Sequence, residues 1–175
     1  MKILLASLFL LSVYPVLANI PEIAGPISGD VRANQVTLWM HAPPKSKCSF
    51  SYYAEGAETD KKTGDLKAIP NQAAKGMGQI FKSTVVGLLP NADYHYKVSI
   101  DGKSEPDWKG SFKTAPVEGK STAFRMAITS CMKIGRPQGS WNLLLAEQPD
   151  FHLTVGDTHY ADTTDPTIQL KHHVT

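Results

Sequence analysis

The amino-acid sequence predicts two folded units in succession: an all-β sandwich, and then the incomplete β-α-β start of an α/β domain. Short alternating segments separated by turn residues fill about residues 25 to 116, the pattern of a half-buried antiparallel sheet. From residue 124 the apolar runs become continuous, and a helical segment lies between two of them, as in a parallel sheet covered by helices. The polar stretch 117–123 is expected to be a linker.

The amino terminus resembles a secretory signal peptide. Lys2 precedes an apolar run over residues 3–18 that Ser7, Ser12 and Pro15 interrupt, and it is too short for a membrane span of about 20 residues. Val16 and Ala18 are the small residues expected three and one positions before a cleavage site. We therefore predict a signal peptide over residues 1–18 and a secreted or periplasmic protein without a membrane anchor after cleavage. A retained anchor is the alternative.

The sandwich is expected to occupy residues 19–116. In its first clear strand, residues 35–42, Val36, Leu38 and Met40 lie on one face. A second strand places Cys48, Phe50 and Tyr52 on one face. The stretch from Gly56 to Gly78 is polar and is expected to be a loop, after which strand character resumes.

The clearest strand covers residues 94–100 and is followed by Asp101-Gly102, a dipeptide typical of a hairpin turn. Leu88, Pro90 and Tyr94 resemble the tyrosine-corner signature of fibronectin type III and immunoglobulin-like domains, in which the phenol bonds back to nearby backbone. Ala92 stands where the fibronectin pattern often has Thr. An immunoglobulin/fibronectin type III-like sandwich is therefore expected, although this fold hosts many functions.

The second unit, residues 124–175, begins with two apolar runs around a helix. We expect Ser140 as its N-cap, Trp141, Leu144 and Leu145 on one face, and Pro149 as its stop. A further helix is expected to start with Asp165 as N-cap and Pro166 at its first position. Because so few elements cannot bury both faces of a parallel sheet, this segment is expected to open a larger, truncated domain.

Candidate functional residues follow the two expected parallel strands. Cys131 ends the first apolar run, and Asp157 directly follows the second. Ligands of open parallel sheets bind outside the carboxyl ends of the strands, and neighbouring strands bring these ends together. A soft thiolate and a carboxylate able to bridge two cations suit a metal site, and Tyr160 is close enough in sequence to add a phenolate.

Each candidate also has a structural interpretation. A lone Cys131 is commonly buried filler, or it pairs with Cys48 in an oxidising compartment; Asp157 is typical of a turn and Tyr160 of packing. Asp162 and Asp165 are expected to be loop and N-cap residues. Metal binding is an alternative for His159, His172 and His173, which are expected to be solvated or capping residues. Contact with a phosphate is an alternative for Lys133 and Arg136, which are expected to lie in a solvated loop. Spacing alone indicates a metal site without establishing it.

Charge argues against nucleic acid as a partner. The chain has 18 Lys+Arg and 16 Asp+Glu, a formal charge of +2, which is too small and too scattered for the basic stripe of a nucleic-acid-binding protein. The composition, 42% hydrophobic and 19% charged, is that of an ordinary globular protein and excludes disorder, collagen and coiled coil.

Longer motifs resemble one family. The segments FRMAITSC, W-x-x-L-x-x-x-x-P-D and FHLTVGDTHYADTTDP resemble the start of the metallophosphatase domain of alkaline phosphatase D-like (PhoD-like) proteins. The segments GPISGDVRANQVTLWMHAP and V-x-G-L-x-P-x-A-x-Y-x-Y resemble that family's N-terminal domain. Purple acid phosphatases are also similar, but their first strand should end in D-x-G, whereas this one ends in TSCM.

The resemblance implies a secreted, metal-dependent phosphoester hydrolase, an alkaline phosphatase or phosphodiesterase with Fe3+ and Ca2+ acting on a phosphate ester substrate. It implies Cys131 as the thiolate ligand of iron, Asp157 as the metal-bridging carboxylate and Tyr160 as the phenolate ligand. The family's G-N-H-[DE] and G-H-x-H motifs do not occur in the 175 residues. We therefore expect an N-terminal fragment that is inactive alone; the alternative is a truncated exported β-sandwich binding module without catalytic activity.

Overall fold

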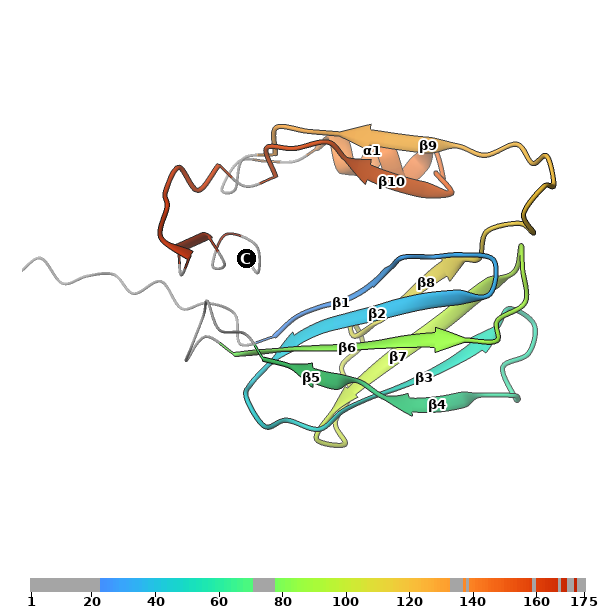
Figure 1. The fold of residues 1–175 in the computed structure, drawn as a ribbon, viewed down its shortest axis with the longest axis horizontal. Helices are drawn as coiled ribbons and strands as arrows, with labels where there is room; N and C mark the ends of the chain where they lie inside the picture. Colours follow the sequence, from blue (N-terminus) through green and yellow to red (C-terminus); the bar gives the residue numbers. More distant parts are fainter. Residues whose placement is uncertain are drawn as a thin grey trace, which may run out of the picture.

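The computed structural model describes residues 23–70, 78–132, 137, 139–158, 160–166, 168, 169 and 172. The expected signal peptide, Lys133, Arg136, His159 and His173 lie outside these residues. Figure 1 shows the elements in chain order: β1 (Ala24–Gly29), β2 (Gln35–Ala42), β3 (Cys48–Ala54), β4 (Lys62–Asp65), β5 (Lys67–Ile69), β6 (Gln79–Val86), β7 (Asp93–Ile100), β8 (Lys109–Lys113), β9 (Met126–Thr129), α1 (Ser140–Ala146) and β10 (Phe151–Thr154).

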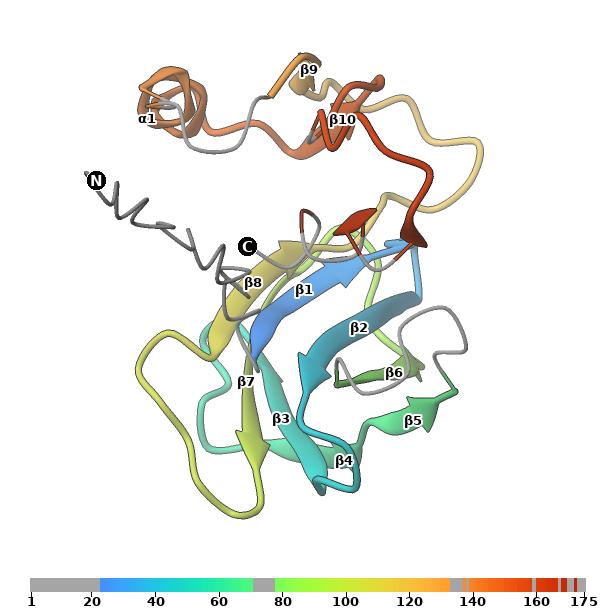
Figure 2. The same ribbon diagram turned by 90° about the vertical axis from the view of Figure 1, so that its left-hand side faces the viewer.

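Two antiparallel sheets form the sandwich. One has the strand order β1-β2-β6-β5 and the other β4-β3-β7-β8, and Figure 2 shows them face to face. Consecutive side chains of a strand point to opposite faces, so every second residue enters the space between the sheets. The predicted sandwich is confirmed.

The core of the sandwich follows the alternation in the sequence. On β2, Val36, Leu38 and Met40 are buried, and on β3 the inward residues include Cys48 and Phe50. β7 contributes four more buried side chains: Tyr94, Tyr96, Val98 and Ile100. Tyr94 stacks on Phe112 of β8 with ring centroids 5.3 Å apart. Aromatic side chains bury large areas, so these rings form much of the contact between the sheets.

The expected tyrosine corner is present between β6 and β7. The phenol oxygen of Tyr94 accepts a hydrogen bond from the backbone N–H of Leu89 at 2.9 Å. Beside it, the buried Thr114 hydroxyl donates to the Leu89 carbonyl at 2.7 Å and accepts from the Ala92 N–H at 2.9 Å. The corner therefore holds the last segment of the sandwich as well as the start of β7.

The turn after β7 also agrees with the sequence. Asp101 and Gly102 both have positive φ, 50° and 77°, as the two central residues of a type I′ turn require. Ile100 and Lys103 close this turn with two backbone hydrogen bonds of 2.9 Å.

The prediction of a polar loop from Gly56 to Gly78 is wrong in part, because β4 and β5 lie in it. β4 pairs with β3 in one sheet, and β5 pairs with β6 in the other. The chain crosses between the sheets at Leu66, which is only 5% exposed. Both are short edge strands that carry a lysine, a common protection against edge-to-edge aggregation. Strands of four and three residues are too short to show a periodicity in the sequence.

Residues 124–158 form a second assembly, here called the β-α-β unit. β9 and β10 are parallel and in register from the Met126–Phe151 pair onward, and α1 connects them, as predicted. The ring of Trp141 on α1 meets that of His152 on β10 edge-on, with centroids 5.2 Å apart. The helix therefore covers one face of the two strands.

Two details of the predicted helix are wrong. Gly139 occupies the N-cap position without a side-chain hydrogen bond, and Ser140 is already helical. Leu145 is 65% exposed, because a helix of two turns against two strands covers little more than the stripe through Trp141 and Leu144.

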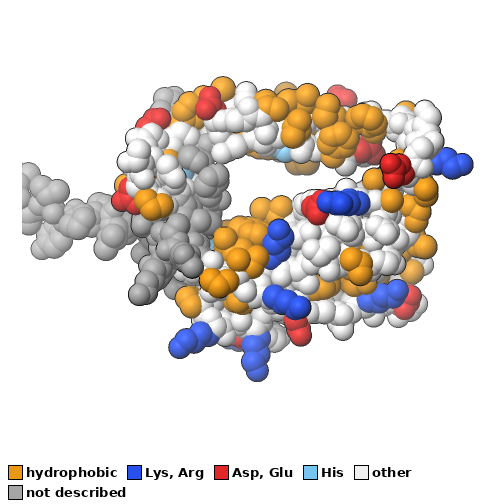
Figure 3. All heavy atoms as spheres, in the orientation of Figure 1, with side chains coloured by type: hydrophobic (Ala, Val, Ile, Leu, Met, Phe, Trp, Pro, Cys, Tyr) orange, Lys and Arg blue, Asp and Glu red, His pale blue; other side chains and the backbone are white. Residues whose placement is uncertain are grey.

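The other face of the β-α-β unit is apolar and uncovered in the described part of the chain. Figure 3 shows hydrophobic side chains gathered over it. The exposed residues are Phe124, Met126, Ile128, Phe151, Leu153 and Val155. None of the described residues after Thr114 is buried. No helix among the described residues is long and apolar enough to cross a membrane.

Candidate metal centre

Two loops at one edge of the β-α-β unit carry the candidate ligands. Cys131 lies two residues beyond β9, and Asp157 lies three residues beyond β10. Because the strands run parallel, both loops leave from the same edge. Backbone hydrogen bonds of 2.9 Å join them, from Val155 N–H to the Thr129 carbonyl and from Met132 N–H to the Asp157 carbonyl. The loops are therefore bonded to each other and not merely adjacent.

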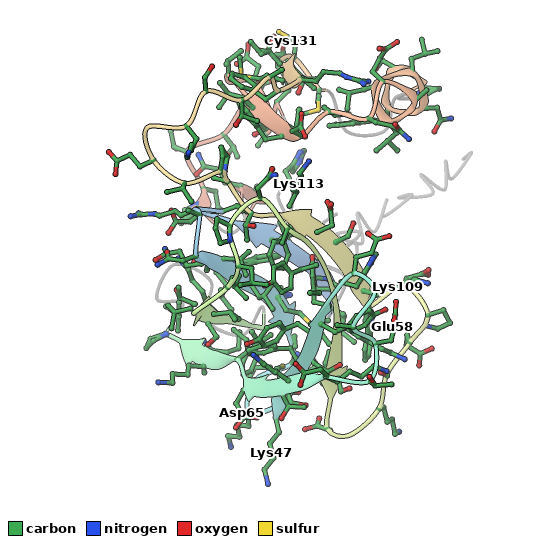
Figure 4. All side chains as sticks on the ribbon, turned by 90° about the vertical axis from the view of Figure 1, so that its right-hand side faces the viewer. Lys47, Glu58, Asp65, Lys109, Lys113 and Cys131 are labelled. Carbon is green, nitrogen blue, oxygen red and sulfur yellow. The ribbon has the colours of Figure 1, made fainter. Side chains whose placement is uncertain are left out.

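The three candidate side chains converge on one carboxylate oxygen. The Sγ atom of Cys131 lies 3.7 Å from Oδ2 of Asp157, and the Tyr160 phenol donates a hydrogen bond to the same oxygen at 3.3 Å. All three residues are exposed, and Figure 4 shows Cys131 on the outer side of the unit, away from the sandwich. The structure thus brings together a thiol, a carboxylate and a phenol that solvent can reach.

The backbone at this centre adopts an unusual conformation. Cys131, Asp157, Tyr160 and Asp162 have φ values of 60°, 50°, 49° and 49°, in the left-handed region that residues other than Gly, Asn and Asp rarely adopt. For Cys and Tyr this conformation costs roughly 1–2 kcal/mol each. Such conformations concentrate at functional sites, where they hold side chains in a required direction.

The electrostatics of the three groups favour a bound cation. The hydrogen bond with Cys131 and then the partial desolvation and the negative charge of Asp157 raise the pKa of Tyr160 to about 12. The phenol therefore keeps its proton at neutral pH when no cation is present. A cation placed among the three groups would favour their charged forms, because an opposite charge nearby stabilises an ionised group. Thiolate, phenolate and carboxylate together form a donor set that fits a metal ion.

The remaining candidates that the structure describes are Asp162, Asp165 and His172. Asp162 lies in the loop, and Asp165 directly precedes the helical residue Pro166 and accepts a backbone hydrogen bond from Gln169 at 3.0 Å, as a residue at a helix start does. His172 lies in a helical turn. Among the residues that the structure covers, no group of three His, Cys, Asp or Glu residues could hold a metal. The third donor beside Cys131 and Asp157 is the phenol of Tyr160, which contacts Asp157.

A polar contact that the sequence did not predict lies next to the centre. Thr129 Oγ1 lies 2.6 Å from Nε2 of His152, so a polar pair joins β9 to β10 just before the Cys131 loop. A cavity of about 310 Å³ beside it has Cys131, Ser140 and Trp141 in its wall. His152 is a polar residue inside an otherwise apolar strand, and this could have indicated a polar contact in the sequence. Its partner Thr129 follows only from the register between β9 and β10.

The cysteines are both free thiols, one buried and one exposed. Cys48 lies in the sandwich core and Cys131 in the β-α-β unit, so the pairing that the sequence left open is not formed.

Comparison with known proteins identifies the family to which this chain belongs. The family model for the N-terminal domain of PhoD-like phosphatases matches residues 21–116, more than half of the chain. The chain belongs to the PhoD-like phosphatase family. No curated protein matches the chain.

Among solved structures, that of PhoD shows the same fold. The structure of PhoD is 20% identical, with a TM-score of 0.56 over 82% of this chain and 29% of that chain. The sensor domain of the anti-sigma factor RsgI4 from Pseudobacteroides cellulosolvens is 21% identical over 58% of this chain and 96% of its own, with a TM-score of 0.44. A human collagen XX fibronectin type III domain is 15% identical over 59% and 100%, with a TM-score of 0.38. This chain thus spans less than a third of PhoD.

Proposed function

We propose that this chain supplies the N-terminal sandwich and the first metal ligands of a secreted, metal-dependent phosphoester hydrolase. The observation that carries the proposal is the convergence of Cys131, Asp157 and Tyr160 on one point at the ends of two parallel strands. Family membership supports phosphate esters as the substrate class, and the apolar amino-terminal run supports export.

In this proposal Cys131 and Tyr160 would hold Fe3+ as thiolate and phenolate ligands, and the Asp157 carboxylate would be a ligand shared by Fe3+ and Ca2+. The bound metals would polarise the phosphoryl oxygens and lower the pKa of a bound water. The chain itself holds the three donors in place through the left-handed backbone at each donor and the hydrogen bond from Met132 to Asp157. Metal ligands bind in their deprotonated form, and the pKa of Tyr160 is raised, so metal binding weakens as pH falls.

Residues 1–175 alone are expected to hydrolyse phosphate esters negligibly. They contain neither the G-N-H-[DE] nor the G-H-x-H motif, so the ligands of a second metal and a phosphate-contacting histidine are absent from them. Metal-dependent phosphoryl transfer relies on positioning and charge stabilisation by the complete set of metals and side chains. Hydrolysis of p-nitrophenyl phosphate that is lost in Cys131→Ala and Asp157→Asn would overturn this expectation.

The test is an Fe3+ titration of the purified chain, followed by visible absorption. We expect a phenolate-to-iron charge-transfer band that Tyr160→Phe abolishes, and at least tenfold weaker binding in Asp157→Asn and Cys131→Ser, since even outer-shell changes weaken metal sites by about 10–100-fold. Tyr53→Phe is the matched control, because this tyrosine lies on β3 in the sandwich. Equal binding in all four variants would contradict the assignment.

A second candidate function is a binding module formed by the exported sandwich alone. It is favoured by the distribution of the core, since every buried residue among those described lies in the sandwich or at its end, from Val36 to Thr114. The same titration separates the two functions, because bound iron that depends on Tyr160 counts against a β-α-β unit without a role.

A further inference from the structure

Asp150 lies where the two strands of the β-α-β unit begin. It directly precedes β10, and Arg125 directly precedes β9. The Arg125 backbone N–H donates to Oδ2 of Asp150 at 2.8 Å, and the Asp150 N–H donates to the Arg125 carbonyl at 2.9 Å. The Arg125 guanidinium also donates to the carbonyl of Glu147 at the end of α1. Asp150 and Arg125 therefore tie together the ends of β9, α1 and β10.

The second oxygen of Asp150 is directed to the sandwich. Nζ of Lys113, the last residue of β8, lies 3.9 Å from Oδ1 of Asp150, with 40% and 36% of the two side chains exposed. Figure 4 shows Lys113 at the end of the sandwich nearest the β-α-β unit, whereas Lys109 of the same strand lies farther from it. One carboxylate thus contacts both folded units, with a different oxygen for each.

The covalent connection between the units gives little orientation of its own. Residues 117–123 contain no helix or strand, and all are exposed. The one backbone hydrogen bond described within this stretch runs from Lys120 to Val117 at 3.1 Å. The direction in which the β-α-β unit extends from the sandwich therefore depends on noncovalent contacts such as the Lys113–Asp150 pair.

We propose that Asp150 is a positioning residue that sets the orientation of the β-α-β unit relative to the sandwich, through its ion pair with Lys113. The loops of Cys131 and Asp157 extend from the strands that Asp150 and Arg125 tie together, so the ion pair also sets the orientation of these loops relative to the sandwich. This consequence for the metal centre rests on the proposed function, whereas the ion pair and its effect on the orientation of the β-α-β unit do not. A half-exposed pair is weak and is screened by salt, so the orientation depends on ionic strength.

The experiment measures cleavage of the full chain after Glu118 by endoproteinase Glu-C, without metal, in about 20 mM NaCl. Asp150→Asn keeps an oxygen for the Arg125 N–H but removes the charge, and Lys113→Met removes the partner. Each is expected to accelerate cleavage about two- to fivefold, which corresponds to about 0.4–1 kcal/mol. About 0.5 M NaCl should abolish the difference from the wild-type chain.

Two further variants make the test specific. Lys113→Arg retains the charge and should retain slow cleavage, which distinguishes an ion pair from general loss of packing. Lys109→Met removes an exposed lysine of the same strand that makes no ion pair among the described residues, and it should cleave like the wild type. Equal cleavage of Asp150→Asn, Lys113→Met and Lys109→Met would overturn the proposal.

The Fe3+ titration links the ion pair to the metal centre. Asp150→Asn should shift the phenolate charge-transfer band or weaken iron binding about twofold at low salt, whereas Lys109→Met should change neither. A cleavage difference with no iron binding in any variant would leave the orienting role intact and refute the proposed function. Iron binding without a cleavage difference would refute the orienting role of Asp150 and leave the proposed function intact.

Discussion

At the scale of single residues, the two thiols of the chain lie in opposite environments. Cys48 is 3% exposed and lies opposite Ile100 in the sandwich. Burial and then the negative charge of Asp101 raise the pKa of the Cys48 thiol to about 11, from 9.0. Cys131 is exposed at the end of a strand. Cys48 is thus a small apolar core residue, and the thiol placed for chemistry is Cys131.

The raised pKa of Cys48 predicts how stability changes with pH. Since the folded state holds the proton more tightly than the unfolded state, this contribution is complete below about pH 9 and is lost as pH rises toward 11. At pH 10 the wild type should have lost about 1 kcal/mol relative to Cys48→Ala, as each pKa unit corresponds to about 1.36 kcal/mol. Urea unfolding at pH 7 and pH 10 measures the change. Cys131→Ala retains Cys48, so it should lose as much stability between pH 7 and pH 10 as the wild type, whereas Cys48→Ala should not. An equal loss in Cys131→Ala and Cys48→Ala would contradict the explanation.

At the scale of elements, the edge strand β4 depends on a glycine. A Cβ atom at Gly64 would lie 2.6 Å from Cζ of Phe50, whereas a Cβ atom at Gly29 of β1 would meet nothing within 4 Å. The Phe50 ring belongs to the buried core, so it cannot move aside into solvent.

Gly64→Ala is therefore expected to lower the free energy of unfolding by about 1–3 kcal/mol, the usual range for overpacking. Gly29→Ala, in a strand of the other sheet, should change it by less than about 0.5 kcal/mol. Urea denaturation of the two variants measures both values. A similar loss at both positions would show that the replacement of glycine in a strand, and not the clash with the Phe50 ring, lowers the free energy of unfolding.

The elements also show which features a sequence can predict. The alternation over β2 and β7, the hairpin at Asp101-Gly102 and the bond to Tyr94 were all expected, because each depends on residues close in the chain. β4 and β5 were not expected, since segments this short form strands only through pairing with β3 and β6. At the candidate centre, the proximity of Cys131 and Asp157 followed from the topology of parallel strands. The pairing of Thr129 with His152 required the register.

At the scale of the whole molecule, the two units differ in how much surface they bury. The sandwich contains all the buried side chains among the described residues, and α1 contains none. Hydrophobic burial is the dominant favourable contribution to folding, so cooperative stability belongs to the sandwich.

Residues 19–116 are accordingly expected to fold alone, with a thermal midpoint within about 5 °C of the full chain, a shift that corresponds to roughly 1 kcal/mol for a domain of this size. Differential scanning calorimetry of both polypeptides compares the midpoints, and far-ultraviolet circular dichroism verifies the sheet content. A sandwich that fails to fold, or melts much earlier, would mean that the β-α-β unit contributes to its stability.

By itself the sequence determined the class of each unit and the position of the candidate ligands at the strand ends. Hydrophobic periodicity and turn residues are local properties that the sequence displays directly. Only the tertiary structure decided that Cys48 and Cys131 remain apart, that Tyr160 reaches the carboxylate of Asp157, and that Asp150 joins β10 to Lys113. These contacts depend on strand register and on the relative placement of segments distant in the chain, and no short window of sequence contains that information.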